Sequence, residues 1–430
     1  MIDKTLVSRG GFVKSILDNG LRVVTCEMPH TRSVSISVFV GVGSRYESDE
    51  QAGTSHLIEH LLFKGTERRP SPGDITGTIE ATGGVINAGT EQEMTTYWCK
   101  VAEPHFLESF DLMIDMLRFS VFRAEDIERE RMVVIDELAM LDDYPNSKVD
   151  VIIDEMLWPN HPLGRDVGGS KESVSAITRD MMLDFMALHY NSSNIVLSVA
   201  GNLTHDGVLS EVTRLCGDWP AAGPQEWTRF DRVQSEPQVR LEYRRTEQAH
   251  LSIALPGVSV NDPDQYALDL LSIVLGEGMS SRLFMEVRER LGLAYDVHSG
   301  VTHFKDCGSF VINAGIDPKR LYEAVRTILD QVDGVREGVP EEELEKAKRL
   351  IEGRLLLRME DSRAVSGWMG TQELLLGNSY ETDEIIERVR GVSPADVLRV
   401  ANDVLVRQRL NLAVVGPLRG GRRLERILAL

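Results

Sequence analysis

The chain has 430 residues, of which 42% are hydrophobic and 27% are charged, a globular composition with room for two domains of about 200 residues each. The formal net charge of −20 argues against a nucleic-acid partner, because phosphate binding needs a basic face, but is compatible with basic peptides or metal cations. No run reaches the roughly 18 apolar residues of a membrane helix, so we expect no membrane partner.

The N-terminal sequence MIDKTLVSRGGFVKSILDNG lacks the apolar core and small-residue cleavage site of a secretory signal. The cysteines are widely spaced and form no CxxC pair; they are Cys26, Cys99, Cys216 and Cys307. This pattern is typical of free thiols in a reducing compartment. Both observations predict a cytoplasmic location.

The first periodic segments are an alternating strand at 34–42 and an apolar helical segment at 52–66, AGTSHLIEHLLFKGT. On that helix His56 and His60 lie four positions apart and point the same way. Two imidazoles so placed can bind one metal ion, and Glu59 projects from the same side. The alternative is a pair of core histidines that are satisfied by hydrogen bonds.

A third metal ligand is expected from another element, because catalytic zinc normally takes three protein ligands and a water molecule. The charged helix predicted at 124–142 carries Glu130 and Glu137, two helical turns apart on one face. The neighbouring letters RMVVI suggest that this face is buried, where two carboxylates need a partner charge. We expect Glu137 to be the ligand and Glu130 to orient the ligands from outside.

The later elements repeat those of the first half in the same order. The matching segments are 34–42 and 249–258, 95–117 and 308–332, 123–141 and 339–357, 175–190 and 390–406, and 194–203 and 409–418. Thr178 and Ser393 are the predicted N-caps of matching helices. A near-constant offset between the members of each pair indicates a duplicated domain.

We therefore expect an α+β fold of two tandem homologous domains, each a mainly antiparallel sheet covered by helices. The first domain is predicted at residues 1–222 and contains the histidines. A linker is predicted at 223–238, where Gly, Pro and polar residues interrupt the periodicity, and the second domain at 239–430.

Several motifs together resemble the pitrilysin and mitochondrial processing peptidase family. HLIEH is the inverted zinc motif H-x-x-E-H of the inverzincins, and it is accompanied by NGLRVV at 19–24, GSRYE at 43–47, GGVINAGTEQEMTTY at 83–97 and ERERMVVIDE at 128–137. The resemblance covers essentially the whole chain. It implies a zinc metalloendopeptidase that encloses unfolded peptides in a clamshell chamber. Because such a chamber needs four of these domains, a homodimer is expected.

The resemblance also implies roles for residues of the first domain. Zinc (Zn2+) would be held by His56, His60 and Glu137, with Glu130 in support and Glu59 as the general base. A structural zinc site would instead fill all four positions with protein ligands, and no cysteine cluster is available for that.

Two further pairs of residues match substrate-binding positions of the family. Asn87 and Ala88 match an Asn-Ala pair on an edge strand, along which an extended peptide is expected to add as a β-strand. Arg288 and Tyr295 match a pair in the second domain that hydrogen-bonds the substrate carbonyl. Without the neighbouring zinc motif, an ordinary hairpin strand is the simpler interpretation of the first pair.

Two alternative functions remain open from the sequence. A presequence-type processing peptidase would carry acidic residues at positions that here hold Ser147 and Val151, which favours a broader oligopeptidase. A non-catalytic assembly subunit is the other alternative, since some relatives are structural cores of larger complexes. Those relatives usually lose zinc residues, whereas all four expected positions are present here.

Overall fold

The computed structural model describes residues 11–223, 226–231 and 233–428. The ends of the predicted domains and three positions of the predicted linker lie outside these residues. The chain divides into two compact units. The first runs to Leu138 and adds Asp166–Thr228 and Leu355–Thr382, whereas the second comprises Ala139–Arg165, Arg229–Arg354 and the chain from Asp383 onward.

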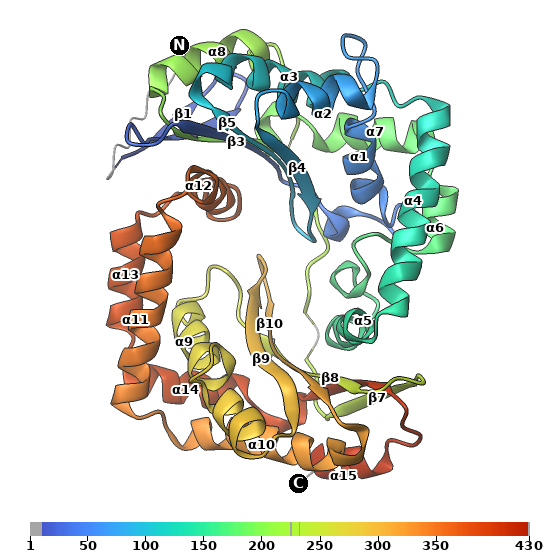
Figure 1. The fold of residues 1–430 in the computed structure, drawn as a ribbon, viewed down its shortest axis with the longest axis vertical. Helices are drawn as coiled ribbons and strands as arrows, with labels where there is room; N and C mark the ends of the chain where they lie inside the picture. Colours follow the sequence, from blue (N-terminus) through green and yellow to red (C-terminus); the bar gives the residue numbers. More distant parts are fainter. Residues whose placement is uncertain (1–10, 224–225, 232, 429–430) are drawn as a thin grey trace. The chain divides into compact units, whose positions relative to one another are not determined.

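The first unit is built on a six-stranded sheet. Its strands are β1 (Phe12–Ile16), β2 (Arg22–Glu27), β3 (Ser33–Val40), β4 (Val85–Thr90), β5 (Thr95–Ala102) and β6 (Ile195–Gly201). Figure 1 labels β1, β3, β5 and β4 of this sheet. The strands lie in the order β1-β2-β6-β3-β5-β4, and every neighbouring pair is antiparallel except β2 with β6. β4 is therefore an edge strand, as expected.

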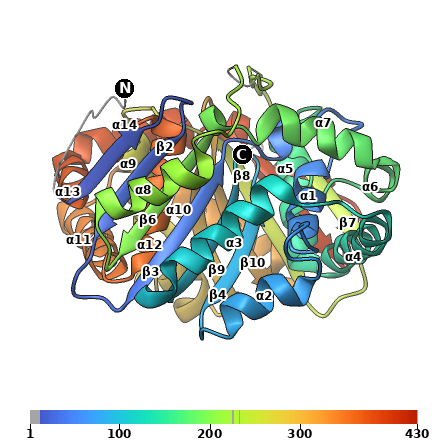
Figure 2. The same cartoon turned by 90° about the horizontal axis from the view of Figure 1, so that it is seen from above.

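Helices cover both faces of this sheet. They are α1 (Thr54–Leu62), α2 (Pro72–Glu80), α3 (Phe106–Phe119), α4 (Ala124–Asp143), α6 (Lys171–Ala176), α7 (Arg179–His189), α8 (His205–Cys216) and α12 (Ser362–Leu376). Figure 2 shows α3 and α8 lying over the strands. Alternate residues of β3 divide between two cores: Ile36 and Val38 face the core that includes α1 and α3, and Phe39 packs with Val365 and Met369 of α12.

The second unit repeats this sheet without a counterpart of β1. Its strands are β7 (Gln238–Tyr243), β8 (Ala249–Gly257), β9 (Ala294–His303), β10 (Gly308–Ile316) and β11 (Asn411–Gly416). Their order β7-β11-β8-β10-β9 repeats the order β2-β6-β3-β5-β4, including one parallel pair at the same place, β7 with β11. The predicted duplication of a mainly antiparallel α+β plan is confirmed by this topology.

The helices of the second unit correspond to those of the first. They are α5 (Pro145–Leu157), α9 (Gln265–Gly276), a π-helix (Phe284–Arg290), α10 (Leu321–Glu337), α11 (Glu341–Arg358), α13 (Thr382–Gly391), α14 (Pro394–Val404) and α15 (Arg422–Leu428). Both predicted N-caps are confirmed: the Thr178 side chain accepts from the backbone N–H of Met181 at the start of α7, and Ser393 accepts from Asp396 at the start of α14.

The two halves of the chain exchange one helix each. The domains predicted from the sequence are consecutive stretches of chain and do not include this exchange. α12 comes from the second half but packs on β3 and β6, whereas α5 comes from the first half and packs on β8 and β11. The contact of α12 is close: a Cβ added to Gly370 would lie 2.0 Å from the Phe39 ring. Hydroxyl groups bridge the same contact, with Ser35 and Ser362 oxygens 2.9 Å apart.

The four cysteines are free, as expected. Cys99 and Cys216 are buried, and burial raises the pKa of each thiol to about 12. Within the described residues, none of the helices combines the length and the apolar run that crossing a membrane requires.

Candidate metal centre

Helix α1 presents its polar residues on the side that its apolar residues leave free. Its buried face packs into the core of the first unit through Leu57, Ile58, Leu61 and Leu62. At 100° per residue these four side chains cover one side of the helix. His56, Glu59 and His60 therefore share the opposite side, where they are half-buried.

The start of α1 is held by the side chain of Glu47, which lies shortly before the helix in the chain. The Glu47 carboxylate, only 3% exposed, accepts hydrogen bonds from the backbone N–H groups of Gly53 (2.8 Å) and Ser55 (2.7 Å). Gly53 has φ 91°, and a Cβ there would lie 2.4 Å from the carbonyl oxygen of Gly168. A negative charge at a helix N-terminus is favourable. Glu47, which the sequence reasoning did not select, thus fixes the helix that carries the histidines.

Helix α4 faces α1 with the two glutamates, but its burial differs from the expectation. Glu130 is 4% exposed, whereas the Glu137 side chain is 40% exposed. The expectation that RMVVI is buried was wrong for Met132 and Val133, which are exposed, and right for Val134. The helical period explains this, because Val134 lies one turn after Glu130 on the side toward α1.

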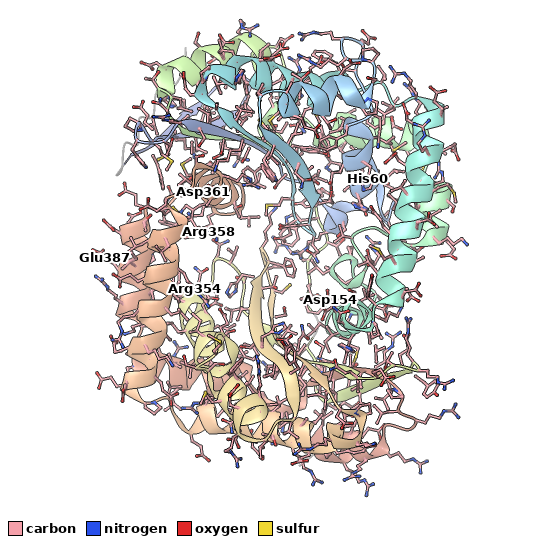
Figure 3. All side chains as sticks on the ribbon, viewed as in Figure 1. His60, Asp154, Arg354, Arg358, Asp361 and Glu387 are labelled. Carbon is pink, nitrogen blue, oxygen red and sulfur yellow. The ribbon has the colours of Figure 1, made fainter. Side chains whose placement is uncertain are left out.

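Within the described residues, one group of three potential metal ligands has its donor atoms within 4.8 Å of one another, namely His56, His60 and Glu137. Glu137 Oε2 lies 3.9 Å from His56 Nε2 and 3.6 Å from His60 Nε2. Figure 3 shows His60 on α1 beside α4. Two imidazoles and one carboxylate fit a divalent metal such as zinc, with a position left open for a further ligand.

Glu130 approaches the other nitrogen of His60. Its Oε2 lies 3.3 Å from His60 Nδ1, and its Oε1 lies 2.8 Å from the ammonium nitrogen of Lys64. A proton on Nδ1 of His60 would be donated to this carboxylate, which leaves Nε2 free to bind a metal. Lys64 balances the charge of the buried carboxylate.

Burial shifts the pKa values of two groups at this site. The pKa of His56 is lowered to about 4, first by burial and then by the neighbouring His60. It is therefore neutral at physiological pH, the form that binds metals. The pKa of Glu59 is raised, mainly by burial, against the opposing effect of a hydrogen bond from Thr90. Thr90 was not selected from the sequence either, since one threonine in a strand carries no distinctive signal.

Asn87 and Ala88 lie on the edge strand β4, next to the strand β5 that pairs with them. The Asn87 side chain is exposed and the Ala88 side chain is half-buried. Helix α1 contacts the same strand. Strand β4 therefore lies beside the helix that carries the histidines.

Arg288 and Tyr295 belong to the second unit, on the π-helix and on β9. The Arg288 guanidinium lies over the Tyr295 ring, 4.9 Å from its centroid, and 4.6 Å from the centroid of Phe284. The Tyr295 side chain is 77% exposed. The structure thus brings the predicted pair together within the second unit, while the metal-ligand group belongs to the first.

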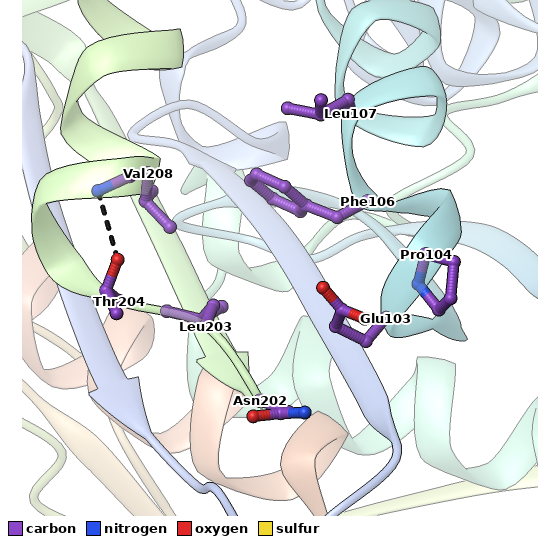
Figure 4. A pocket seen from close by; sticks show the side chains of 9 residues that line it. Glu103, Pro104, Phe106, Leu107, Asn202, Leu203, Thr204 and Val208 are labelled. Atoms are coloured by element: carbon purple, nitrogen blue, oxygen red, sulfur yellow. Dashed lines mark hydrogen bonds between the residues drawn. The ribbon is translucent and has the colours of Figure 1, made fainter.

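The first unit also contains a cavity of about 270 Å³, whose lining shares no residue with the metal-ligand group (Figure 4). It lies between the beginnings of α3 and α8 and is lined by Glu103, Pro104, Phe106, Leu107, Asn202, Leu203, Thr204, Gly207 and Val208. One carboxylate and no histidine or cysteine line it, so it does not offer a competing metal site.

Two histidines and two carboxylates therefore converge in one copy of a duplicated α+β plan. The family model for insulinase (peptidase family M16) matches residues 22–171, and the model for the peptidase M16 inactive domain matches residues 176–351. The chain belongs to peptidase family M16.

Several bacterial relatives align along almost the whole chain. An uncharacterized zinc protease of Streptomyces coelicolor is 37% identical over 413 residues, which is 94% of this chain and 90% of that protein. Another of Bacillus subtilis is 34% identical, covering 93% of this chain and 97% of that protein.

Solved structures share the fold at lower identity. A protease from Helicobacter pylori superimposes with a TM-score of 0.89 at 22% identity, covering 94% of this chain and 99% of that chain. A chain of complex III2 from Candida albicans superimposes with a TM-score of 0.83 at 19% identity, covering 96% and 99%.

Proposed function

We propose that this protein is a zinc-dependent metalloendopeptidase that hydrolyses unfolded peptides. The observation that carries the proposal is the convergence of His56, His60 and Glu137 donor atoms beside the half-buried Glu59. Zinc is the cofactor: this donor set suits it, and the relatives are named zinc proteases. When bound, the ion supplies a Lewis acid for peptide hydrolysis.

The chain's own residues perform the remaining steps of the proposed mechanism. Glu59 accepts a proton from the attacking water molecule and returns it to the leaving amine. Its raised pKa suits the first role, because a stronger base takes the proton more readily. Glu130 holds His60 in the tautomer that a metal needs. Backbone groups of β4 around Asn87 and Ala88 pair with an extended peptide.

The direct test is a digest of a peptide library by the zinc-loaded protein, with cleavage sites mapped by mass spectrometry and the Glu59→Gln protein as the blank. We expect unstructured peptides to be cut and a stable folded protein to resist, because only an extended chain can add to an edge strand. Absence of cleavage by a protein shown to contain zinc would refute the proposal.

A non-catalytic assembly subunit is the second candidate, because the same fold occurs in a chain of complex III2. That similarity concerns the fold alone. Zinc analysis separates the two candidates, because a purified chain that binds no added zinc and gains no activity would be a scaffold. Presequence-type processing is tested in the same digest by comparing basic amphipathic peptides with neutral ones.

We further propose that the protein acts as a two-fold homodimer, in which Arg288 and Tyr295 of one copy serve the metal site of the other. The support is the resemblance to chamber-forming peptidases, together with the proximity of Arg288 to Tyr295. A hydrogen bond from either side chain would stabilise the substrate carbonyl as it gains negative charge.

A further inference from the structure

The backbone of β4 turns every second residue toward its free edge. The backbone N–H of Glu91 donates to Met94 O at 2.8 Å in the turn that joins β4 to β5. Because bonding alternates along an antiparallel pair, Gly89 and Asn87 bond to β5 in the same way, and the residues between them face outward. The free edge therefore consists of the backbone groups of Ile86, Ala88 and Thr90.

Two of these outward positions already have partners. The Ala88 N–H donates to the Asn87 side-chain oxygen at 2.8 Å, which agrees with its outward direction. The Thr90 hydroxyl donates to Glu59 Oε2 at 2.6 Å. Glu59 thus lies against the free edge at the last residue of the strand.

The two contacts differ in how easily a peptide can replace them. Asn87 is exposed and bonds within its own strand, so an incoming peptide carbonyl can take its place. Glu59 is held by a helix, and its bond from the Thr90 hydroxyl is charge-assisted and short. An added strand can therefore pair along Ile86 and Ala88 and reaches Glu59 at Thr90.

We infer that Thr90 is a positioning residue that fixes the Glu59 carboxylate at the end of the peptide-binding edge. This inference rests on the proposed peptidase function and specifies how the substrate strand aligns with β4. Successive outward positions are two residues apart. A peptide that pairs with Ala88 therefore reaches the next outward position, Thr90, beside Glu59. One Glu59 oxygen is held by Thr90, which leaves the other directed away from that bond and able to accept a proton.

The test compares Thr90→Val, which keeps the shape and removes the hydroxyl, with Thr90→Ser, which keeps the hydroxyl. We expect Thr90→Val to lower kcat about 10- to 100-fold with KM changed less than about 3-fold, and Thr90→Ser to restore most of kcat. Thr82→Val is the matched control, since its hydroxyl bonds to the backbone of Ile79 and not to Glu59. Normal kcat in Thr90→Val would overturn the inference.

A second measurement needs no activity. In the zinc-free protein, Glu59→Ala should shift the NMR signals of the Thr90 side chain, because the Thr90 hydroxyl loses its acceptor, whereas Glu50→Ala, at an exposed position in the same unit, should not. Unchanged Thr90 signals would also overturn the inference. If the wild-type protein contained zinc and cut no peptide, the peptidase proposal would fail, while this NMR result would still report on the Thr90 contact.

Discussion

The two sheets share one strand order, but the helices that follow the equivalent strands β3 and β8 carry different kinds of side chain. Helix α1 follows β3 and leaves His56, Glu59 and His60 half-buried on the side away from the core. Helix α9 follows β8 and is buried along nearly its whole length by apolar residues such as Leu268 and Leu271. The fold needs only an apolar face at this position, so the other face was free to acquire ligands in one copy.

The edge strands differ in the same way. β4 ends at Thr90, which bonds to Glu59. β9 carries the exposed Tyr295 beside Arg288. We propose that the duplication separates two roles, with the metal ligands and the peptide-binding strand β4 in the first unit and the Arg288–Tyr295 contact to the substrate carbonyl in the second.

The largest effect is expected for Glu59→Gln. Removing the proton acceptor should lower kcat by about 10² to 10⁴-fold, while zinc content stays at the wild-type level because the three proposed ligands remain. Steady-state peptide hydrolysis and metal analysis measure the two quantities. Glu50→Gln, also in the first unit, is the control, and near-normal turnover of Glu59→Gln would remove this residue from the mechanism.

Substitutions of the two glutamates of α4 should lower the zinc affinity by different amounts. Glu137→Gln should weaken zinc binding more than the roughly 10- to 100-fold expected for Glu130→Gln, because an amide is a poor ligand whereas Glu130 acts through His60. Competition with a chelator of known affinity gives both constants. If Glu130→Gln lost zinc and Glu137→Gln kept it, the two roles would be reversed.

The contribution of the second unit can be tested by mixing inactive proteins. Glu59→Gln and Arg288→Ala are each expected to be nearly inactive. If the homodimer places each Arg288 at the other copy's metal site, mixed dimers contain one intact site, and activity should return to at most about a quarter of wild type. Failure to recover activity despite demonstrated subunit exchange would confine Arg288 to its own chain or exclude it from catalysis.

The sequence predicted features that depend on local pattern or on a known motif. Periodicity located the strands and helices, and capping chemistry identified Thr178 and Ser393. The inverted motif selected His56 and His60, and the helix predicted at 124–142 together with the family resemblance selected Glu137, which converges with them. Glu47 and Thr90 lie within the motifs at 43–47 and 83–97, but neither was given a role. Glu47 bonds to the start of α1 across a short loop, and Thr90 reaches Glu59 from another element; neither contact leaves a distinctive signal in the sequence. The exchange of α5 and α12 was missed for the same reason, since an amphipathic helix does not specify which sheet it covers.

The smallest effect concerns how each copy starts its helix after the equivalent strand. At α1 the buried Glu47 accepts two backbone N–H bonds, whereas Asp264 at the N-cap of α9 makes no cap bond and pairs with Arg399 at the surface. Glu47→Gln keeps one acceptor and turns an NH2 group toward the other N–H, so the free energy of opening α1 should fall by about 2 kcal/mol. Asp264→Asn should lower that of α9 by less than about 1 kcal/mol, as for exposed ion pairs. Hydrogen exchange of the two helices in zinc-free protein measures both, and equal losses would show that α1 does not depend on the Glu47 carboxylate.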